Sequence, residues 1–175
     1  MRILTDKASV GKYLSISFFR KEEDFQRYIR EAQTFDLKRL VCEDFYQDLV
    51  SDTPQRDYTL LLEGGSYTHQ GRKYEFAGLK AVLSYFAYAR YLITGHQVDT
   101  PYGVRSKVYQ DGEGISQAER RDLHTMYLQN AHELWEDCKR YIERHKEQFP
   151  EWEKCNECGC EEKQERRGRM RVTLI

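Results

Sequence analysis

The residues best suited to chemistry are three closely spaced cysteines, Cys155, Cys158 and Cys160. The first two form a C-x-x-C pair, a spacing that lets two thiolates bind one tetrahedral metal ion, and Cys160 can add a third ligand. A closed zinc site needs a fourth ligand, which we expect from Cys138, His145 or a neighbouring subunit. Reduced thiols without metal and a redox role remain open alternatives to zinc.

Other catalytic patterns are missing from the sequence. The five histidines are scattered, and no H-E-x-x-H pattern occurs. There is also no G-x-S-x-G motif, no Walker A loop and no Rossmann fingerprint. Neighbouring acids such as Glu22 and Glu23 lie on polar stretches typical of solvated surface. We therefore do not expect an enzyme.

The length and charge of the chain further limit what kind of protein it can be. The 175 residues fit one domain with an appendage. With 28 basic and 29 acidic residues, the net charge of −1 gives no overall attraction to nucleic acid or to an anionic membrane. No apolar run approaches the ~20 residues that span a bilayer, and the N-terminus lacks the apolar core of a signal peptide. We expect a cytosol-like compartment, where five cysteines argue against a disulfide framework.

The apolar spacing predicts a mainly α fold, a bundle of about four helices. A first helix is expected from Lys21, and a second one, capped by Asp36, through Leu49. Residues 58–76 alternate and contain paired glycines, which predicts a small β-hairpin or extended excursion.

The richest apolar stretch predicts a central helix from Phe76 to Ile93, buried on several sides. Thr100 to Lys107 is expected to be a loop, because proline and glycine interrupt it. Ser116 and Glu119 form a capping-box pattern, which predicts the start of a long C-terminal helix of about thirty residues.

From residue 151 the sequence becomes strongly charged, so we expect a helical domain, 1–150, followed by an irregular Cys-rich tail, 151–175. A basic cluster, Arg166 to Arg171, can contact phosphate or an acidic protein surface. The closing residues, Val172 to Ile175, are β-prone, and they can either add a strand to a neighbour's sheet or stay frayed.

Three stretches resemble the small helical head-to-tail connector proteins of tailed bacteriophages, particularly those of Bacteroidetes and crAss-like phages. They are YIREAQTFDLKRLVCEDFYQDLV (28–50), YEFAGLKAVLSYFAYARYL (74–92) and DTPYGVRSK (99–107), the last followed by the long helix. The Cys-rich tail departs from the pattern of common connector proteins.

This resemblance implies a structural protein of the virion neck, made in the host cytoplasm. About twelve copies would form a ring that joins the portal and capsid to the tail and lines the DNA path. The implied partners are further copies of the chain, the portal protein, other neck or tail proteins and passing DNA without sequence specificity. The alternative is a small zinc-binding module that contacts nucleic acid or protein through its tail.

The residues predicted to contact neighbouring subunits or partners come from the central helix, the loop after it and the tail. They are Tyr85, Tyr88, Arg90, Tyr91, Thr100, Pro101, Tyr102, Gly103, Val104, Lys107, Arg169, Arg171, Val172 and Leu174.

Overall fold

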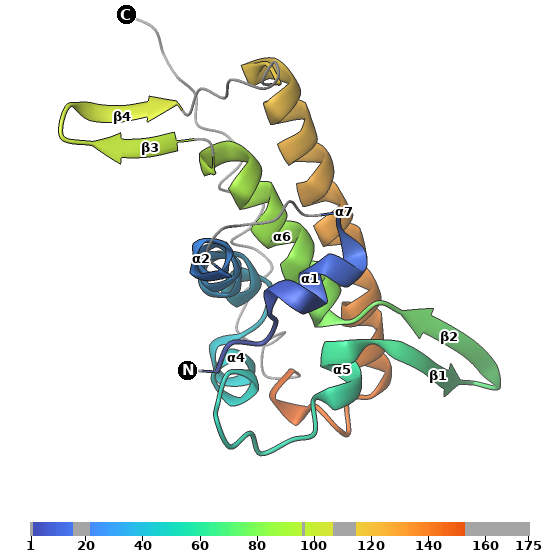
Figure 1. The fold of residues 1–175 in the computed structure, drawn as a ribbon. Helices are drawn as coiled ribbons and strands as arrows, with labels where there is room; N and C mark the ends of the chain where they lie inside the picture. The colour runs from blue at the N-terminus through green and yellow to red at the C-terminus, as the bar shows by residue number, and fades with distance from the viewer. Residues whose placement is uncertain (1, 16–21, 96, 107–114, 153–175) are drawn as a thin grey trace, which may run out of the picture.

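Two long helices, α6 (Leu79–Thr94) and α7 (Gln117–Arg144), pack side by side and form the axis of the protein (Figure 1). The computed structural model describes residues 2–15, 22–95, 97–106 and 115–152. The predicted mainly helical bundle with a long C-terminal helix is confirmed. The Cys-rich tail lies outside the described residues, apart from its first two positions.

Helix α6 is the central helix that the sequence predicts. It begins at Leu79 and not at the expected Phe76, which belongs to the preceding strand, and it ends at Thr94, before the cap residue Gly95. The short helices α1 (Lys7–Tyr13), α2 (Glu22–Glu31) and α5 (Thr59–Glu63) pack against it on the sides that α7 leaves open. Half of its sixteen residues are buried as a result: Leu79, Ala81, Val82, Leu83, Ser84, Phe86, Ala87 and Ala89.

The predicted capping box starts helix α7. The Ser116 hydroxyl accepts a hydrogen bond from the Glu119 backbone N–H at 3.2 Å, and the Glu119 carboxylate accepts one from the Ser116 N–H at 2.8 Å. The helix has 28 residues, a length of about 42 Å at ~1.5 Å per residue. It ends at Arg144, before the expected stop at Phe149, because the chain turns there to bury Phe149 in the core.

The expected boundary between two helices at Asp36 is wrong. Helix α2 continues into a π-helical segment, η1 (Ala32–Leu37), and then into α3 (Lys38–Leu40). The chain leaves the helix at Val41, before α4 (Glu43–Leu49). Asp36 is not a helix cap, since its carboxylate is held by Arg90 of α6 instead.

The excursion expected at 58–76 begins with a short helix. Thr59–Glu63 forms α5 because Leu61 and Leu62, adjacent in sequence, both find buried positions on the core. The predicted hairpin follows as antiparallel strands β1 (Gly65–His69) and β2 (Arg72–Phe76), with Tyr67 opposite Tyr74.

The loop expected at Thr100 to Lys107 contains a second hairpin instead. Strands β3 (Gln97–Thr100) and β4 (Gly103–Ser106) pair antiparallel, with Gln97 opposite Ser106. Proline and glycine exclude a helix here, as predicted, but they mark the turn of a hairpin rather than a longer loop.

The N-terminal segment packs on the body through Gln33, a fully buried amide of η1. Its side-chain oxygen accepts a hydrogen bond from the Leu4 N–H at 3.0 Å, and its amide nitrogen donates to the Arg2 carbonyl at 2.9 Å. Both ends of this polar side chain are therefore satisfied inside the core.

Candidate functional site

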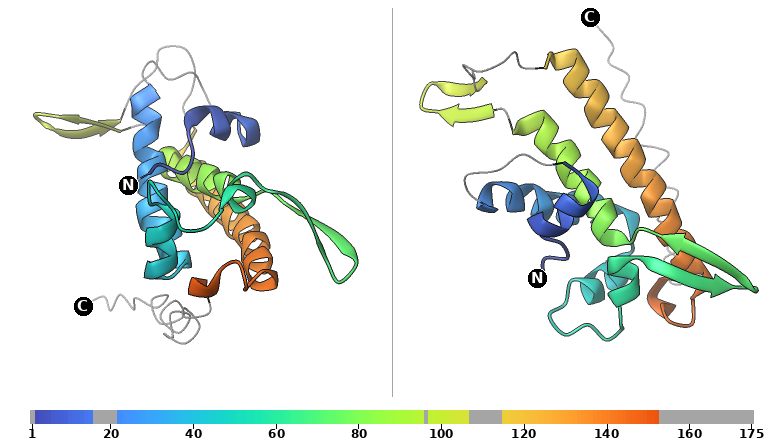
Figure 2. Two further views of the ribbon diagram at one scale, coloured as in Figure 1. Left: turned by 90° about the horizontal axis from the view of Figure 1, so that it is seen from below. Right: turned by 45° about the vertical axis from the view of Figure 1, so that its right-hand side comes forward.

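The hairpin β3–β4 extends away from the bundle near the end of α6, and β1–β2 extends in the opposite direction from the other end of the α6–α7 pair (Figures 1 and 2). The tip of β3–β4 carries Tyr102, which is 88% exposed. Thr100 closes the turn by donating its hydroxyl proton to the Gly103 carbonyl at 2.6 Å. The two hairpins are thus arms on opposite sides of one helical body.

The contact residues predicted in the expected loop after the central helix lie together on this arm. Thr100, Pro101, Tyr102 and Gly103 form its turn, and Val104 lies in β4, where it pairs with Asp99. Lys107 lies outside the described residues, as do Arg169, Arg171, Val172 and Leu174 of the tail. The role of all these residues, in the arm and in the tail, in subunit contacts stays a prediction.

Tyrosines of α6 are half-buried against neighbouring helices. The Tyr88 ring lies 4.8 Å from that of Tyr127 on α7, and Tyr85 lies 5.9 Å from the same ring. Tyr91 meets Phe25 and Tyr28 of α2 edge to face at 6.0 and 5.7 Å. Burial, and then the neighbouring Tyr127, raises the pKa of Tyr88, so this hydroxyl stays neutral. These tyrosines pack the bundle and leave only part of their surface for a partner.

Arg90 is held within the chain by an acidic partner that the sequence did not reveal. Its guanidinium donates two hydrogen bonds to Asp36, Nε–Oδ2 at 2.6 Å and Nη2–Oδ1 at 2.7 Å. Glu31 lies at 4.0 Å, and the Phe35 ring lies 5.4 Å from the guanidinium carbon. The hydrogen bonds to Asp36 raise the pKa of Arg90. This ion pair links η1 to α6, so Arg90 already makes a structural contact within a single chain, without a neighbouring subunit.

The base of the β1–β2 arm is fixed to α7 by aromatic packing. The Phe76 ring stacks on Tyr141 at 4.6 Å, and Tyr67 meets Tyr141 at 5.0 Å. Arg144 lies 4.0 Å over the Tyr74 ring and donates to the Tyr67 hydroxyl at 2.7 Å. Only the outer part of this arm is therefore open to a partner.

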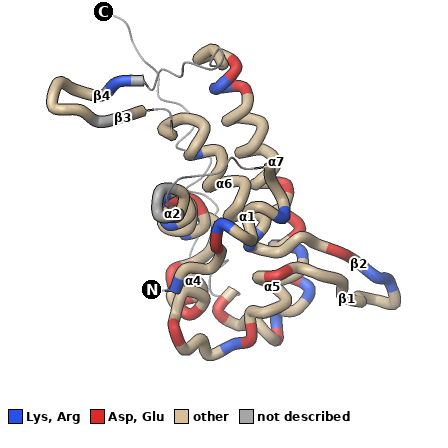
Figure 3. Tube along the Cα trace, in the orientation of Figure 1, with Lys and Arg blue, Asp and Glu red and all other residues tan. Residues whose placement is uncertain are grey.

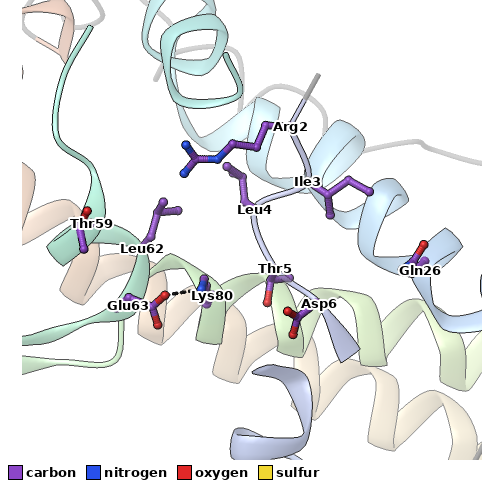
Figure 4. A pocket seen from close by; sticks show the side chains of 10 residues that line it. All are labelled: Arg2, Ile3, Leu4, Thr5, Asp6, Gln26, Thr59, Leu62, Glu63 and Lys80. Carbon is purple, nitrogen blue, oxygen red and sulfur yellow. Dashed lines mark hydrogen bonds and ion pairs between the residues drawn. The ribbon is translucent and has the colours of Figure 1, made fainter. Parts of the chain in front are cut away.

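A cavity of about 370 Å³ lies between the N-terminal segment, α5 and α6 (Figure 4). Its charged groups balance, with Lys80 bonded to the Glu63 carboxylate and Asp6 accepting from the Ser9 N–H at 2.7 Å. Asp6 is the N-cap of α1, and the hydrogen bond that it accepts from the Ser9 N–H lowers the pKa of its carboxyl. The lining residues are Arg2, Ile3, Leu4, Thr5, Asp6, Gln26, Thr59, Leu62, Glu63 and Lys80.

No group of three or more potential metal ligands occurs within 2–15, 22–95, 97–106 and 115–152. The predicted ligands Cys155, Cys158 and Cys160 lie outside these ranges. Cys138, one of the expected fourth ligands, is fully buried, and burial raises the pKa of its thiol to about 12. It is therefore a core residue and not an available ligand.

The fold and its surfaces define a helical protein with two projecting hairpins. The chain belongs to a family of unknown function, DUF6712, which matches residues 37–162. No curated protein and no solved structure matches the chain significantly. Within the described part of the chain, no helix has the length and apolar character needed to cross a bilayer.

Proposed function

We propose that the protein is a structural subunit of the neck of a tailed phage, where copies form a ring between portal and tail. The observation that carries the proposal is the pair of hairpin arms on opposite sides of a rigid helical body (Figure 2). A ring needs each subunit to offer two different surfaces, one to each neighbour. Arms of different sequence on opposite sides meet this requirement.

The β3–β4 arm is the better candidate for contact with a neighbouring copy. An isolated two-stranded hairpin is marginally stable in water, and its outer edges carry unpaired N–H and C=O groups. A neighbouring chain can satisfy these groups by adding a strand, while exposed Tyr102 supplies an aromatic anchor. The β1–β2 arm is already stabilised at its base by Tyr141 and Arg144.

The charge distribution suits a protein that surrounds DNA without binding it tightly. Figure 3 shows acidic and basic residues interspersed along the described chain, with no long stretch of one sign. Strong phosphate binding requires clustered Lys and Arg, which would slow DNA passage. The net charge of −1 gives the chain no overall attraction to DNA, which agrees with a structural role around passing DNA.

Assembly of the purified chain tests the proposal. Mass photometry, with and without portal oligomers, should show a closed ring in at least one condition. Gly103→Val should prevent ring formation, because Gly103 has φ +105° at the turn and a β-branched residue strains that backbone.

Gly71→Val is the matched control, since Gly71 has φ +74° in the turn of the other arm. If β3–β4 makes the ring contact, the Gly71 variant should assemble better than the Gly103 variant. A wild-type chain that stays monomeric in both conditions, or a Gly103 variant that assembles as well as wild type, would count against the proposal.

A further inference from the structure

A second cavity, here called the α4 hollow, lies between helix α4, the loop that follows it and the segment after α7. Its volume is about 540 Å³, within the range of roughly 300–1,000 Å³ typical of ligand pockets. The hollow can therefore admit side chains of another molecule. The lining residues are Asp44, Gln47, Asp48, Ser51, Thr53, Gln55 and Glu151.

Two acids of the α4 hollow have no cationic partner among the described residues. Asp44 is exposed and makes no ion pair there. Asp48 accepts hydrogen bonds from two uncharged donors, the Gln55 N–H at 2.8 Å and the Tyr58 hydroxyl at 2.7 Å. These bonds hold the Asp48 carboxylate in place without offsetting its charge. The third acid, Glu151, pairs with Arg56 at 3.2 Å, so the hollow as a whole is acidic.

The outer end of the β1–β2 arm carries the opposite charge. No Asp or Glu occurs from Gly64 to Tyr74, and two basic residues, Arg72 and Lys73, directly follow the turn of the arm. Figure 3 shows them near the end of the arm. Lys73 lies 3.1 Å from Glu75. Arg72 is exposed, and its guanidinium has no ion pair or hydrogen bond within the described chain, so it is available to an acidic partner.

The two charged surfaces lie on opposite sides of the same end of the molecule. The β1–β2 arm projects on one side and α4 lies on the other, in each of the views that show both (Figures 1 and 2). The base of the arm is held by Tyr141, so the tip of the arm cannot reach the α4 hollow of its own chain. Copies placed side by side in one orientation bring the arm of one chain to the hollow of the next, which is the head-to-tail contact of a ring.

We propose that Arg72 at the tip of the β1–β2 arm binds Asp44 and Asp48 in the α4 hollow of the next copy. The inference rests on the ring assembly of the proposed function and adds a second contact to the same interface, which β1–β2 enters from one side and β3–β4 from the other. Hydrogen bonds from a guanidinium to carboxylates are directional and charge-assisted. Exposed ion pairs add little stability, so this contact selects which sides of neighbouring copies meet, while β3–β4 supplies most of the affinity.

Charge reversal on either side tests the contact. Arg72→Glu or Asp44→Arg alone should raise the protein concentration for half-maximal assembly about tenfold, because like charges then meet. An equimolar mixture of the two variants should recover assembly, since the two altered surfaces attract each other and so do the two unaltered ones. Mass photometry measures assembly, and circular dichroism shows that both variants fold. Arg121→Glu is the matched control, with the same charge change on an exposed residue near the start of α7, and it should assemble like wild type.

Salt gives a second measurement. Raising the salt concentration from ~0.05 to ~0.5 M should weaken wild-type assembly and narrow its difference from Arg72→Glu. Rings that form equally well with folded Arg72→Glu, or folded variants whose mixture does not recover, overturn this contact and leave the ring proposal standing. If Asp44→Arg weakens only the binding of portal oligomers, the hollow receives another protein and the contact is likewise overturned. A wild-type chain that stays monomeric at low salt, with and without portal, overturns both.

Discussion

The junction between β2 and α6 should be the backbone site most sensitive to an added methyl group. Gly78 has φ +83°, and a Cβ there would lie 2.3 Å from the Gly64 nitrogen and 2.6 Å from the Leu62 carbonyl oxygen. These atoms belong to the chain that enters β1, so backbone meets backbone at the base of the arm. Neither side can move without disturbing the start of the central helix.

Gly78→Ala should therefore lower the free energy of unfolding by roughly 2–5 kcal/mol. The left-handed backbone accounts for about 1–2 kcal/mol of this, and the overlap with backbone atoms adds about 1–3 kcal/mol, as in overpacked cores. Urea unfolding followed by circular dichroism measures the loss directly.

Gly71→Ala is the control that separates strain from overlap. Gly71 has φ +74°, and a Cβ there would meet nothing within 4 Å. It should lose only the strain contribution, about 1–2 kcal/mol. Equal losses of stability in the two variants would contradict this prediction, because they would show that the close approach of Gly78 and Gly64 contributes nothing.

Two further predictions concern partly buried polar pairs. A double-mutant cycle with Arg90→Met and Asp36→Asn should give a coupling free energy of about 1 kcal/mol, weakened by salt, and coupling near zero would contradict a structural role for the pair. Burial, and then the hydrogen bond donated to Asp48 at 2.7 Å, raises the pKa of Tyr58. Its contribution to stability is complete below pH ~10 and falls as the pH rises beyond it, because only the unfolded chain ionises there. Tyr58→Phe should make the alkaline loss of stability less steep in urea titrations, and an unchanged slope would contradict this.

Local signals in the sequence predicted the elements that depend on local interactions. The capping box at Ser116 and Glu119 starts α7 because both hydrogen bonds close within four residues. The central helix was predicted from the apolar spacing between Phe76 and Ile93, although it starts only at Leu79. The β1–β2 hairpin was expected from the paired glycines Gly64 and Gly65, but its turn lies at Gln70 and Gly71, and Gly65 is the first residue of β1.

Features that depend on distant contacts were predicted wrongly or missed. Asp36 has the chemistry of a helix cap, yet a partner 54 residues away takes its carboxylate. Thr59–Glu63 alternates like a strand, but a short helix buries both Leu61 and Leu62. The position of Cys42 beside Glu151 could not be predicted from the sequence, since it arises only when the chain folds. Pro101 and Gly103 predicted a non-helical segment, but the strands on either side of them were not predicted.

The central claim is that this chain forms a ring in the neck of a phage particle. Cryo-electron microscopy of purified particles tests it most directly. We expect a closed ring between portal and tail whose subunits fit the α6–α7 pair, with the β3–β4 arm contacting the next copy. Absence of the chain from purified particles, or a neck whose density fits other proteins throughout, would contradict it.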